Sequence, residues 1–331
     1  MKQRLHNILM APLGWMLHLL ALMPWWVLHA HASVLYFLIY HVVGYRRKVV
    51  RQNLLECFPG KSEKERRNIE KEFFRHFADM FFETIKLLHI SPDDMRKRIE
   101  FVNAEYLDRA FENNQSVMLY ISHLGNWEWI TSLSLWLSPE TMAAGHLLGS
   151  SYLPLHNKWV DDFMMKIRSH FGFTLISGHH VLRTMLMTRK AGKQIGIGFI
   201  SDQHPLPNDQ DHVVRFLNHP TAIITVTETI ARKLDMRVVY MHMSKVGRSR
   251  YVCRVVPLTD HAATTEPGQL TDTYARLLED NIHEQPAYWL WTHKRWKRRV
   301  EYPEGFVDRL HPGDDRPSPS NNKNLSSTSF K

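Results

Sequence analysis

The spacing of apolar side chains divides this chain into three parts, and the first part is continuously apolar. No Asp, Glu, Lys or Arg occurs between Arg4 and Arg46, and the stretch is dense in Leu, Trp, Met, Val and Tyr. Such a composition is typical of a membrane segment. Proline interrupts it at Pro12 and Pro24, so the longest unbroken part, residues 25–45, matches the roughly 20 residues that a bilayer-crossing helix needs. The pattern predicts an N-terminal membrane anchor over residues 1–50.

Two other interpretations of this apolar stretch stay open at the level of sequence. A secretory signal peptide would explain the basic start and the cleavage-like residues 30–32, although the apolar run continues past that point. A buried helix pair in a soluble protein is the second alternative. Basic residues follow the stretch at once, and by the positive-inside rule they place the rest of the chain in the cytoplasm: Arg46, Arg47, Lys48 and Arg51.

The second part of the chain alternates between helical and strand-like spacing. A helix is expected over residues 61–90, because Ser62 and Glu65 match a capping box and apolar side chains such as Phe73, Phe77 and Phe81 recur at helical intervals. Further on, β-prone runs alternate with helical segments: strands at 117–121, 173–176, 194–200, 237–242 and 251–256, and helices at 127–136, 155–169, 181–190, 222–234 and 272–283. This alternation predicts an α/β fold, a sheet flanked by helices, over residues 51–311.

Composition and charge narrow the possible classes of protein. The 331 residues are 44% hydrophobic, as in a globular chain, whereas the polar tail at 312–331 has no periodic apolar positions and is expected to be disordered. Cys57 and Cys253 are too few for a disulfide scaffold or a cysteine zinc site, which indicates a reducing compartment. The net charge of +9 suits contact with anionic lipid or an acidic protein partner better than nucleic acid.

One short segment offers the residue types needed for acid–base chemistry. His123 directly follows the apolar strand at 117–121, and Glu128 comes five residues later, after a turn that Gly125 makes possible. A neutral imidazole can accept a proton from a hydroxyl, and a carboxylate bonded to its other nitrogen fixes the tautomer. We therefore expect Glu128 to fold back toward His123. A His that only caps a helix or fills the core is the alternative, because such spacing also arises by chance.

The chain lacks the signature of a covalent catalyst. No G-x-S-x-G sequence occurs, and Cys57 has no positioned partner in the sequence. Direct attack by a substrate hydroxyl therefore fits better than a covalent intermediate.

The segment around His123 resembles the H-x4-D/E motif, in its H-x-G-N-W-E form, of the late lipid A biosynthesis acyltransferases, the lauroyl/myristoyl transferase family. Three further segments resemble that family in the same order: residues 152–157 with Asp161, Arg168 and Gly172; Ser201, Asp202 and Gln203; and residues 286–293 with Arg295, Trp296 and Lys297. The resemblance covers roughly residues 1 to 300, and the ordered set is more specific than any single motif.

This resemblance implies a glycerolipid-acyltransferase-like fold with an N-terminal membrane anchor. It also implies transfer of an acyl chain from an acyl carrier protein thioester to a hydroxyl of a lipid A precursor, at the cytoplasmic face of the inner membrane. By the same resemblance His123 is the base and Glu128 its support. The substrate-binding residues that it implies are Asn126, Arg168, Asp202, Gln203 and Arg295.

Two other clusters carry residue types that suit different chemistry. The loop after Asp202 carries His204, Asp209, Asp211, His212 and His219, but the spacings match no tetrahedral or facial-triad site, and acyl transfer to a hydroxyl requires no Lewis acid, so we expect no metal or other cofactor. Residues 288–299 mix tryptophan with basic side chains, which suits a carrier protein or a lipid surface; RNA stacking is disfavoured because no binding module frames the cluster.

The sequence thus predicts a membrane-anchored α/β acyltransferase. Acylation of another lipid, such as a glycerophospholipid or an aminolipid, is the rival within the enzyme class. A catalytically silent module that binds anionic lipid is the rival outside it.

Overall fold

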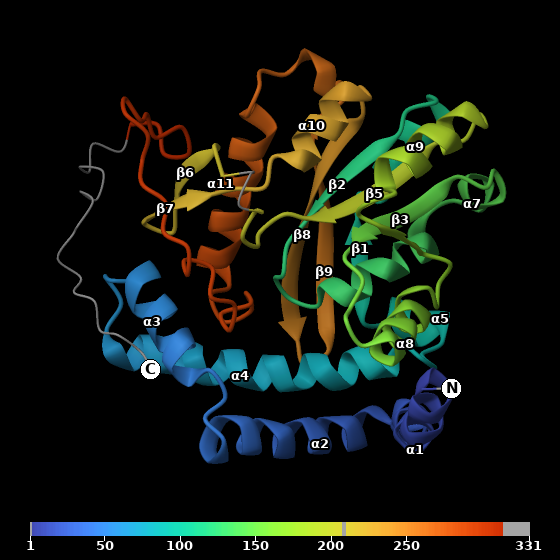
Figure 1. The fold of residues 1–331 in the computed structure, drawn as a ribbon, viewed down its shortest axis with the longest axis vertical. Helices are drawn as coiled ribbons and strands as arrows, with labels where there is room; N and C mark the ends of the chain where they lie inside the picture. Colours follow the sequence, from blue (N-terminus) through green and yellow to red (C-terminus); the bar gives the residue numbers. More distant parts are fainter. Residues whose placement is uncertain (1, 207–209, 314–331) are drawn as a thin grey trace.

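The computed structural model describes residues 2–206 and 210–313, so the predicted tail lies outside the described residues from 314 onward. Its centre is a seven-stranded sheet in the order β1-β9-β8-β2-β5-β3-β4 (Figure 1). All neighbours are parallel except β8 and β9, which form an antiparallel hairpin, and β6 and β7 pair separately. The strands are β1 Ile99–Val102, β2 Val117–Ile121, β3 Leu147–Tyr152, β4 Thr174–Ser177, β5 Ile195–Ile200, β6 Val213–Phe216, β7 His219–Ala222, β8 Arg237–Gly247 and β9 Arg250–Thr259.

Helices flank this sheet, which confirms the predicted α/β class and shows that the sheet is mixed. Among the strand-flanking helices, α10 contacts β2, α11 contacts β8, and α8 and α9 contact β4. The bounds are α1 Lys2–Leu22, α2 Trp25–Phe37, α3 Arg47–Cys57, α4 Glu63–Lys86, α5 Pro92–Arg96, α6 Glu105–Glu112, α7 Pro139–Ala143, α8 Lys158–Arg168, α9 Val181–Lys190, α10 Val226–Lys233 and α11 Gln269–Glu284. A π-helical turn, η1, spans Leu38–Val42, and 3-10 helices span Trp127–Trp136 (η2) and Ala262–Thr264 (η3).

The apolar N-terminus folds as two helices, and the unbroken span expected over residues 25–45 ends earlier, at Val42. Helix α2 passes into η1, and the chain then turns through Gly44 and Arg46, both with positive φ (66° and 49°). Within the described part of the chain, no single helix is long and apolar enough to cross a bilayer; the segments Trp25–Val42 and Arg47–Cys57 together meet that criterion, but they are bent by 84°. Figure 1 shows α1 and α2 in a layer beneath α4.

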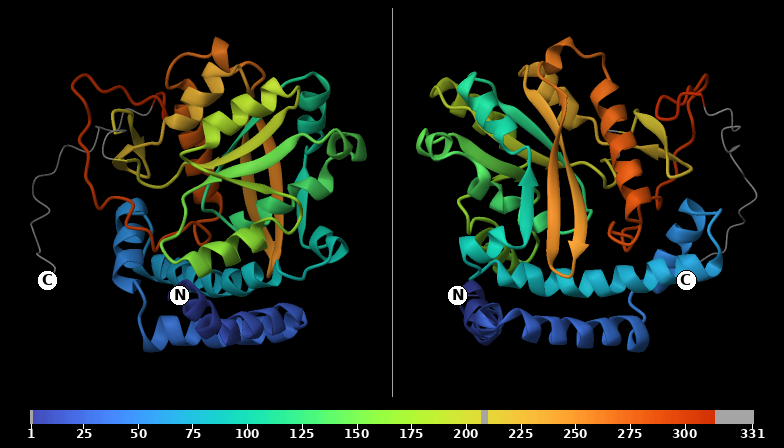
Figure 2. Two further views of the ribbon diagram at one scale, coloured as in Figure 1. Left: turned by 45° about the vertical axis from the view of Figure 1, so that its right-hand side comes forward. Right: turned by 180° about the vertical axis from the view of Figure 1, so that it is seen from behind.

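Helix α4 lies between that N-terminal layer and the sheet. Its capping box at Ser62 and Glu65 is present as predicted, and the helix ends at Lys86. Because it is covered on two sides, it buries polar residues as well as apolar ones: His76, Asp79 and Glu83 are all at most 5% exposed. These three point toward the β8–β9 hairpin, whose turn meets α4 (Figure 2). Of the expected apolar face, Phe73 is buried, whereas Phe81 is 53% exposed.

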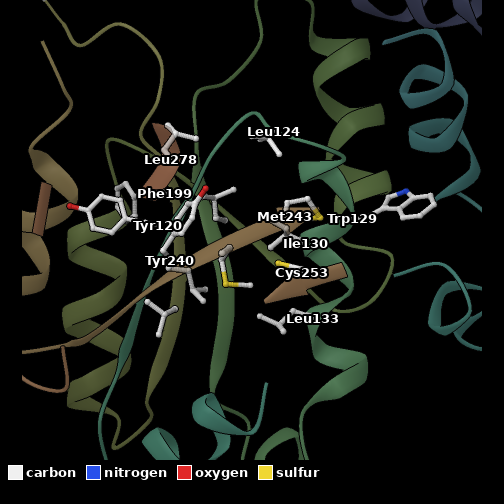
Figure 3. Close-up of a cluster of buried hydrophobic side chains, with 14 of the residues drawn as sticks. Tyr120, Leu124, Trp129, Ile130, Leu133, Phe199, Tyr240, Met243, Cys253 and Leu278 are labelled. Carbon is white, nitrogen blue, oxygen red and sulfur yellow. The ribbon is translucent and has the colours of Figure 1, made fainter. Parts of the chain in front are cut away.

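The core explains why β2 lies in the middle of the sheet. Every residue of β2 is buried, so both faces of this strand need a cover. On one face Tyr120 stacks on Tyr274 of α11, with ring centroids 4.5 Å apart. Figure 3 shows the surrounding cluster, with Tyr240 of β8 beside Tyr120 and Leu278 of α11 close by. The rigid central strand fixes the residues that follow it, beginning with Ser122 and His123.

Candidate active site

The candidate site forms where two parallel strands end side by side. Strands β2 and β5 are neighbours, with Ile121 opposite Ile200, so the residues that follow each strand meet at one edge of the sheet. His123 follows β2, and Asp202 follows β5. Sheet order therefore brings together two residues that are far apart in the sequence.

Asp202 holds the His123 imidazole by two contacts. The Nδ1 atom of His123 lies 2.7 Å from one Asp202 oxygen, and the backbone N–H of His123 donates to the other at 2.8 Å. Trp289 also donates its indole N–H to Asp202, at 2.8 Å. Burial alone would raise the pKa of the Asp202 carboxyl, but the His123 charge and these hydrogen bonds hold that pKa below its usual value. The carboxylate is thus ionised, and it orients the ring.

The other imidazole nitrogen faces a cavity. Gln203 places its side-chain amide nitrogen 3.1 Å from Nε2 of His123, so Nε2 accepts while Nδ1 donates to Asp202. The ring of Trp127 meets the imidazole edge-on, with centroids 4.8 Å apart, and limits its rotation. Nε2 therefore carries the ring's lone pair, and a bound hydroxyl would give its proton there by taking the place of the Gln203 amide.

Glu128 does not bond to His123, which corrects the pairing expected from the sequence. Its carboxylate instead accepts two hydrogen bonds from Arg168, both 2.6 Å long, in a bidentate ion pair. Burial opposes the charge on Arg168, but the hydrogen bonds and charge of Glu128 raise the pKa of its guanidinium. Gly125 makes the expected sharp turn, with φ of 63°, yet the 3-10 helix that follows directs Glu128 toward α8.

A cavity of about 390 Å³ joins these groups. His123, Gln203, Glu128 and Arg168 supply its polar wall, and most other lining side chains are apolar or small: Ile121, Trp127, Ile130, Leu153, Leu155, Phe173, Phe199 and Ile200 are among them. A cavity with a few convergent polar groups and apolar walls is the usual form of a ligand site. This one suits a substrate with a polar reacting centre and an apolar chain.

Comparison with known proteins decides the family. The family model for bacterial lipid A biosynthesis acyltransferases matches residues 7–298. The chain belongs to this family. Its relatives include the lipid A biosynthesis palmitoleoyltransferase of Escherichia coli K12, 24% identical over 77% of this chain and 79% of the relative. A lipid A biosynthesis acyltransferase of Shigella flexneri gives the same values, and one of Haemophilus influenzae is 22% identical over 76% of each chain.

Two expected substrate-binding residues of this acyltransferase lie away from the cavity wall. Asn126 is fully buried and donates to Glu83 at 2.7 Å, beneath the turn that carries His123. Arg295 is 2% exposed and donates to the backbone carbonyl of Ala222 at 2.5 Å. Burial and the nearby Arg295 together lower the pKa of His293 to about 4, so this neighbour is neutral. In the structure, Asn126 and Arg295 thus support the fold around the site.

The tryptophan-rich segment near the C-terminus is largely interior. Trp289 and Trp291 are at most 2% exposed, which corrects the picture of a solvent-facing aromatic surface. Four basic side chains of the segment do face solvent: Lys294, Lys297, Arg298 and Arg299.

The histidine-rich loop supplies no visible metal cluster. Among residues 2–206 and 210–313, no three His, Cys, Asp or Glu side chains gather as ligands, and His212 bonds to Asp272 at 2.7 Å. Asp209 lies outside the described residues.

Sequence reasoning missed three supports of the site. The sequence predicts Trp289 as part of a basic and aromatic surface, whereas its indole N–H donates to Asp202 in the interior. The Tyr251 hydroxyl donates to Glu83 at 2.8 Å under the His123 turn. The only signal for this pair in the sequence is that Glu83 is a polar residue on the apolar face of a helix. The position of Ser201 and Asp202 at a strand end was the available signal for the His123 partner.

Proposed function

We propose that this acyltransferase moves a fatty acyl chain from an acyl carrier protein thioester to a hydroxyl of a lipid A precursor, with His123 as general base. The observation that carries this proposal is the fixed tautomer of His123. A buried carboxylate holds Nδ1, so Nε2 carries the lone pair, at the cavity wall and beside the Gln203 amide that a substrate hydroxyl would displace. A His so arranged can accept the proton of a substrate hydroxyl.

The chemical step balances without a covalent acyl-enzyme. Nε2 of His123 takes the proton of the acceptor hydroxyl while that oxygen attacks the thioester carbonyl. The resulting imidazolium is stabilised by the Asp202 carboxylate, and the carbon–sulfur bond breaks as the tetrahedral intermediate collapses. The same proton then passes from Nε2 to the departing thiolate, which restores the neutral imidazole.

Arg168 and Glu128 act together in this proposal. Glu128 accepts hydrogen bonds from the Nε and Nη2 atoms of Arg168. Among the described residues, no acceptor bonds to the Nη1 atom of Arg168. A guanidinium held in this way can direct its remaining N–H groups at a phosphate or a developing oxyanion. We assign Arg168 to substrate binding and Glu128 to positioning it.

The surroundings support the proposed donor and location. The exposed cations Lys294, Lys297, Arg298 and Arg299 follow the segment that carries Trp289, the Asp202 partner. An acidic carrier protein would be steered to such a surface. The apolar N-terminal helices would hold the enzyme at the membrane, and the basic residues after them support a location at the cytoplasmic face of the inner membrane.

Intact-mass analysis of lipid A tests this function. Lipid A from a strain that lacks the gene should lose the mass of one acyl chain, and the wild-type gene should restore it. Unchanged lipid A together with a changed glycerophospholipid or aminolipid would reject the proposed acceptor. Purified enzyme offered acyl carrier protein and coenzyme A thioesters in turn would settle the donor, because the proposal predicts a marked preference for the former.

A further inference from the structure

A second, larger cavity lies apart from the candidate active site. Its volume is about 720 Å³, and it opens between α2, α4 and the turn of the β8–β9 hairpin. None of its lining residues lines the cavity at His123. In Figures 1 and 2 the turn of the hairpin reaches α4 from the sheet, and α2 lies beneath α4.

Cations outnumber carboxylates in this cavity. Its charged lining consists of Lys71, Arg75, Lys245, Arg248, Glu72 and Asp79. Asp79 accepts a bidentate pair of hydrogen bonds from Arg248 and lies 3.8 Å from Lys245, so the interior carboxylate is already neutralised. Glu72 accepts a hydrogen bond from the Tyr288 hydroxyl.

Two of the cations have no carboxylate partner. Among the described residues, neither Lys71 nor Arg75 forms an ion pair, and the Arg75 guanidinium lies over the Tyr36 ring, 5.2 Å from its centroid. The buried imidazole between these groups adds no negative charge: burial and the nearby Lys245 hold the pKa of His76 well below its usual value, and His76 is therefore neutral. The cavity thus has an unbalanced positive charge.

The wall formed by α2 connects this charge to an apolar surface. Ser33 and Tyr36 line the cavity, while Trp26, Val34 and Phe37 on the same helix are 74%, 59% and 56% exposed. Exposed apolar side chains in such number are unusual for a surface in water and mark a contact with membrane or protein. Cations that lie just beyond an apolar helix face match the arrangement of phosphate groups and acyl chains in a lipid leaflet.

We propose that the cavity lined by Lys71 and Arg75 binds the phosphate group of an anionic membrane lipid, whose acyl chains lie along the apolar face of α2. This lipid is distinct from the acyl acceptor. It would seat the N-terminal helices in the membrane surface and set the height of the active site above it.

Vesicle binding of the full-length protein tests this proposal. The test variant is K71Q/R75Q, which removes the two unpaired cations and leaves the Asp79 ion pairs intact. The matched control is R183Q/K190Q on α9, which removes one exposed arginine and one exposed lysine outside the cavity. Thermal unfolding of each variant verifies that the fold is retained. Vesicles of phosphatidylcholine with and without phosphatidylglycerol are compared at one ionic strength.

We expect the affinity of K71Q/R75Q for the phosphatidylglycerol vesicles to fall on the order of tenfold or more, because each cation near an anionic surface raises the affinity about fivefold. The control should bind like wild type. An equal loss in both variants would show nonspecific attraction and overturn the proposal. Two further results would also overturn it. If millimolar inorganic phosphate competed for the cavity as strongly as vesicles do, the cavity would be a free-phosphate site. If K71Q/R75Q raised the KM for the acceptor tenfold in detergent micelles, the cavity would be an acceptor site.

Discussion

Replacing Asp202 by Asn should remove the general base without removing His123. Asp202 accepts three hydrogen bonds: two at Oδ2, from the His123 backbone and the Trp289 indole, and one at Oδ1, from Nδ1 of His123. An amide offers one oxygen and one NH2 group. The oxygen will face the two fixed donors, so the NH2 group will face Nδ1. Nδ1 must then accept, and the proton moves to Nε2, which can no longer take one from a hydroxyl.

The magnitude follows from this exchange of tautomers. A loss of about 10³–10⁴-fold in kcat is expected, as for the equivalent change in a Ser-His-Asp triad, with little change in KM. The free energy of unfolding should fall by only about 1–3 kcal/mol, because the two N–H donors of His123 and Trp289 keep an oxygen to bond to, and the new NH2 group donates to Nδ1.

The assay is steady-state acyl transfer by purified variants in a double-mutant cycle. Asp202→Asn should cost almost nothing in a His123→Ala background, since the two residues act as a unit. Glu128→Gln should remain costly in that background, because Glu128 acts through Arg168. The reverse outcome, in which Glu128 and not Asp202 is coupled to His123, would refute the partner assignment.

Three other predictions follow from the same contacts. Arg168→Gln leaves the Glu128 carboxylate buried and unpaired, so it should destabilise the fold by about 3 kcal/mol in denaturant unfolding, and Glu128→Gln in the same chain should recover part of the loss. The lowered pKa of Asp202 means that its ionisation stabilises the fold above about pH 4; the stability advantage of wild type over Asp202→Asn should therefore shrink as the pH falls below that value, and an advantage that persisted in acid would contradict this. Replacing the exposed cations Lys294, Lys297 and Arg298 by Gln should raise the KM for acyl carrier protein and flatten its salt dependence, while kcat stays near wild type. Unchanged kinetics across salt concentrations would reject the docking surface.

The sequence predicts an element with its correct bounds where apolar side chains recur at one clear spacing. The strand at 117–121 and the helix at 181–190 have the bounds of β2 and α9, because each has a clear apolar run with turn residues at its ends. Strand β3 was missed because it contains Gly149, Ser150 and Ser151. Its glycine has a packing reason, since a Cβ there would lie 2.2 Å from the Thr174 carbonyl oxygen of β4. That reason is visible only once the two strands are paired.

Five of the seven expected site residues lie together at the cavity, but the carboxylate that pairs with His123 was not predicted. His123, Glu128, Arg168, Asp202 and Gln203 do line or adjoin one cavity, yet spacing within the sequence suggested the wrong carboxylate for His123. The pairing depends on β5 lying beside β2, which is a property of sheet order. The N-terminal break at Gly44 similarly depends on α2 packing along α4, and composition alone cannot show it.

Single-turnover acyl transfer by purified His123→Ala tests the central claim most directly. With enzyme in excess over acyl carrier protein thioester and a lipid A precursor present, the variant should transfer the chain about 10²–10⁴-fold more slowly than wild type, with an unchanged melting temperature. Transfer at the wild-type rate by the folded variant would contradict a general base at His123.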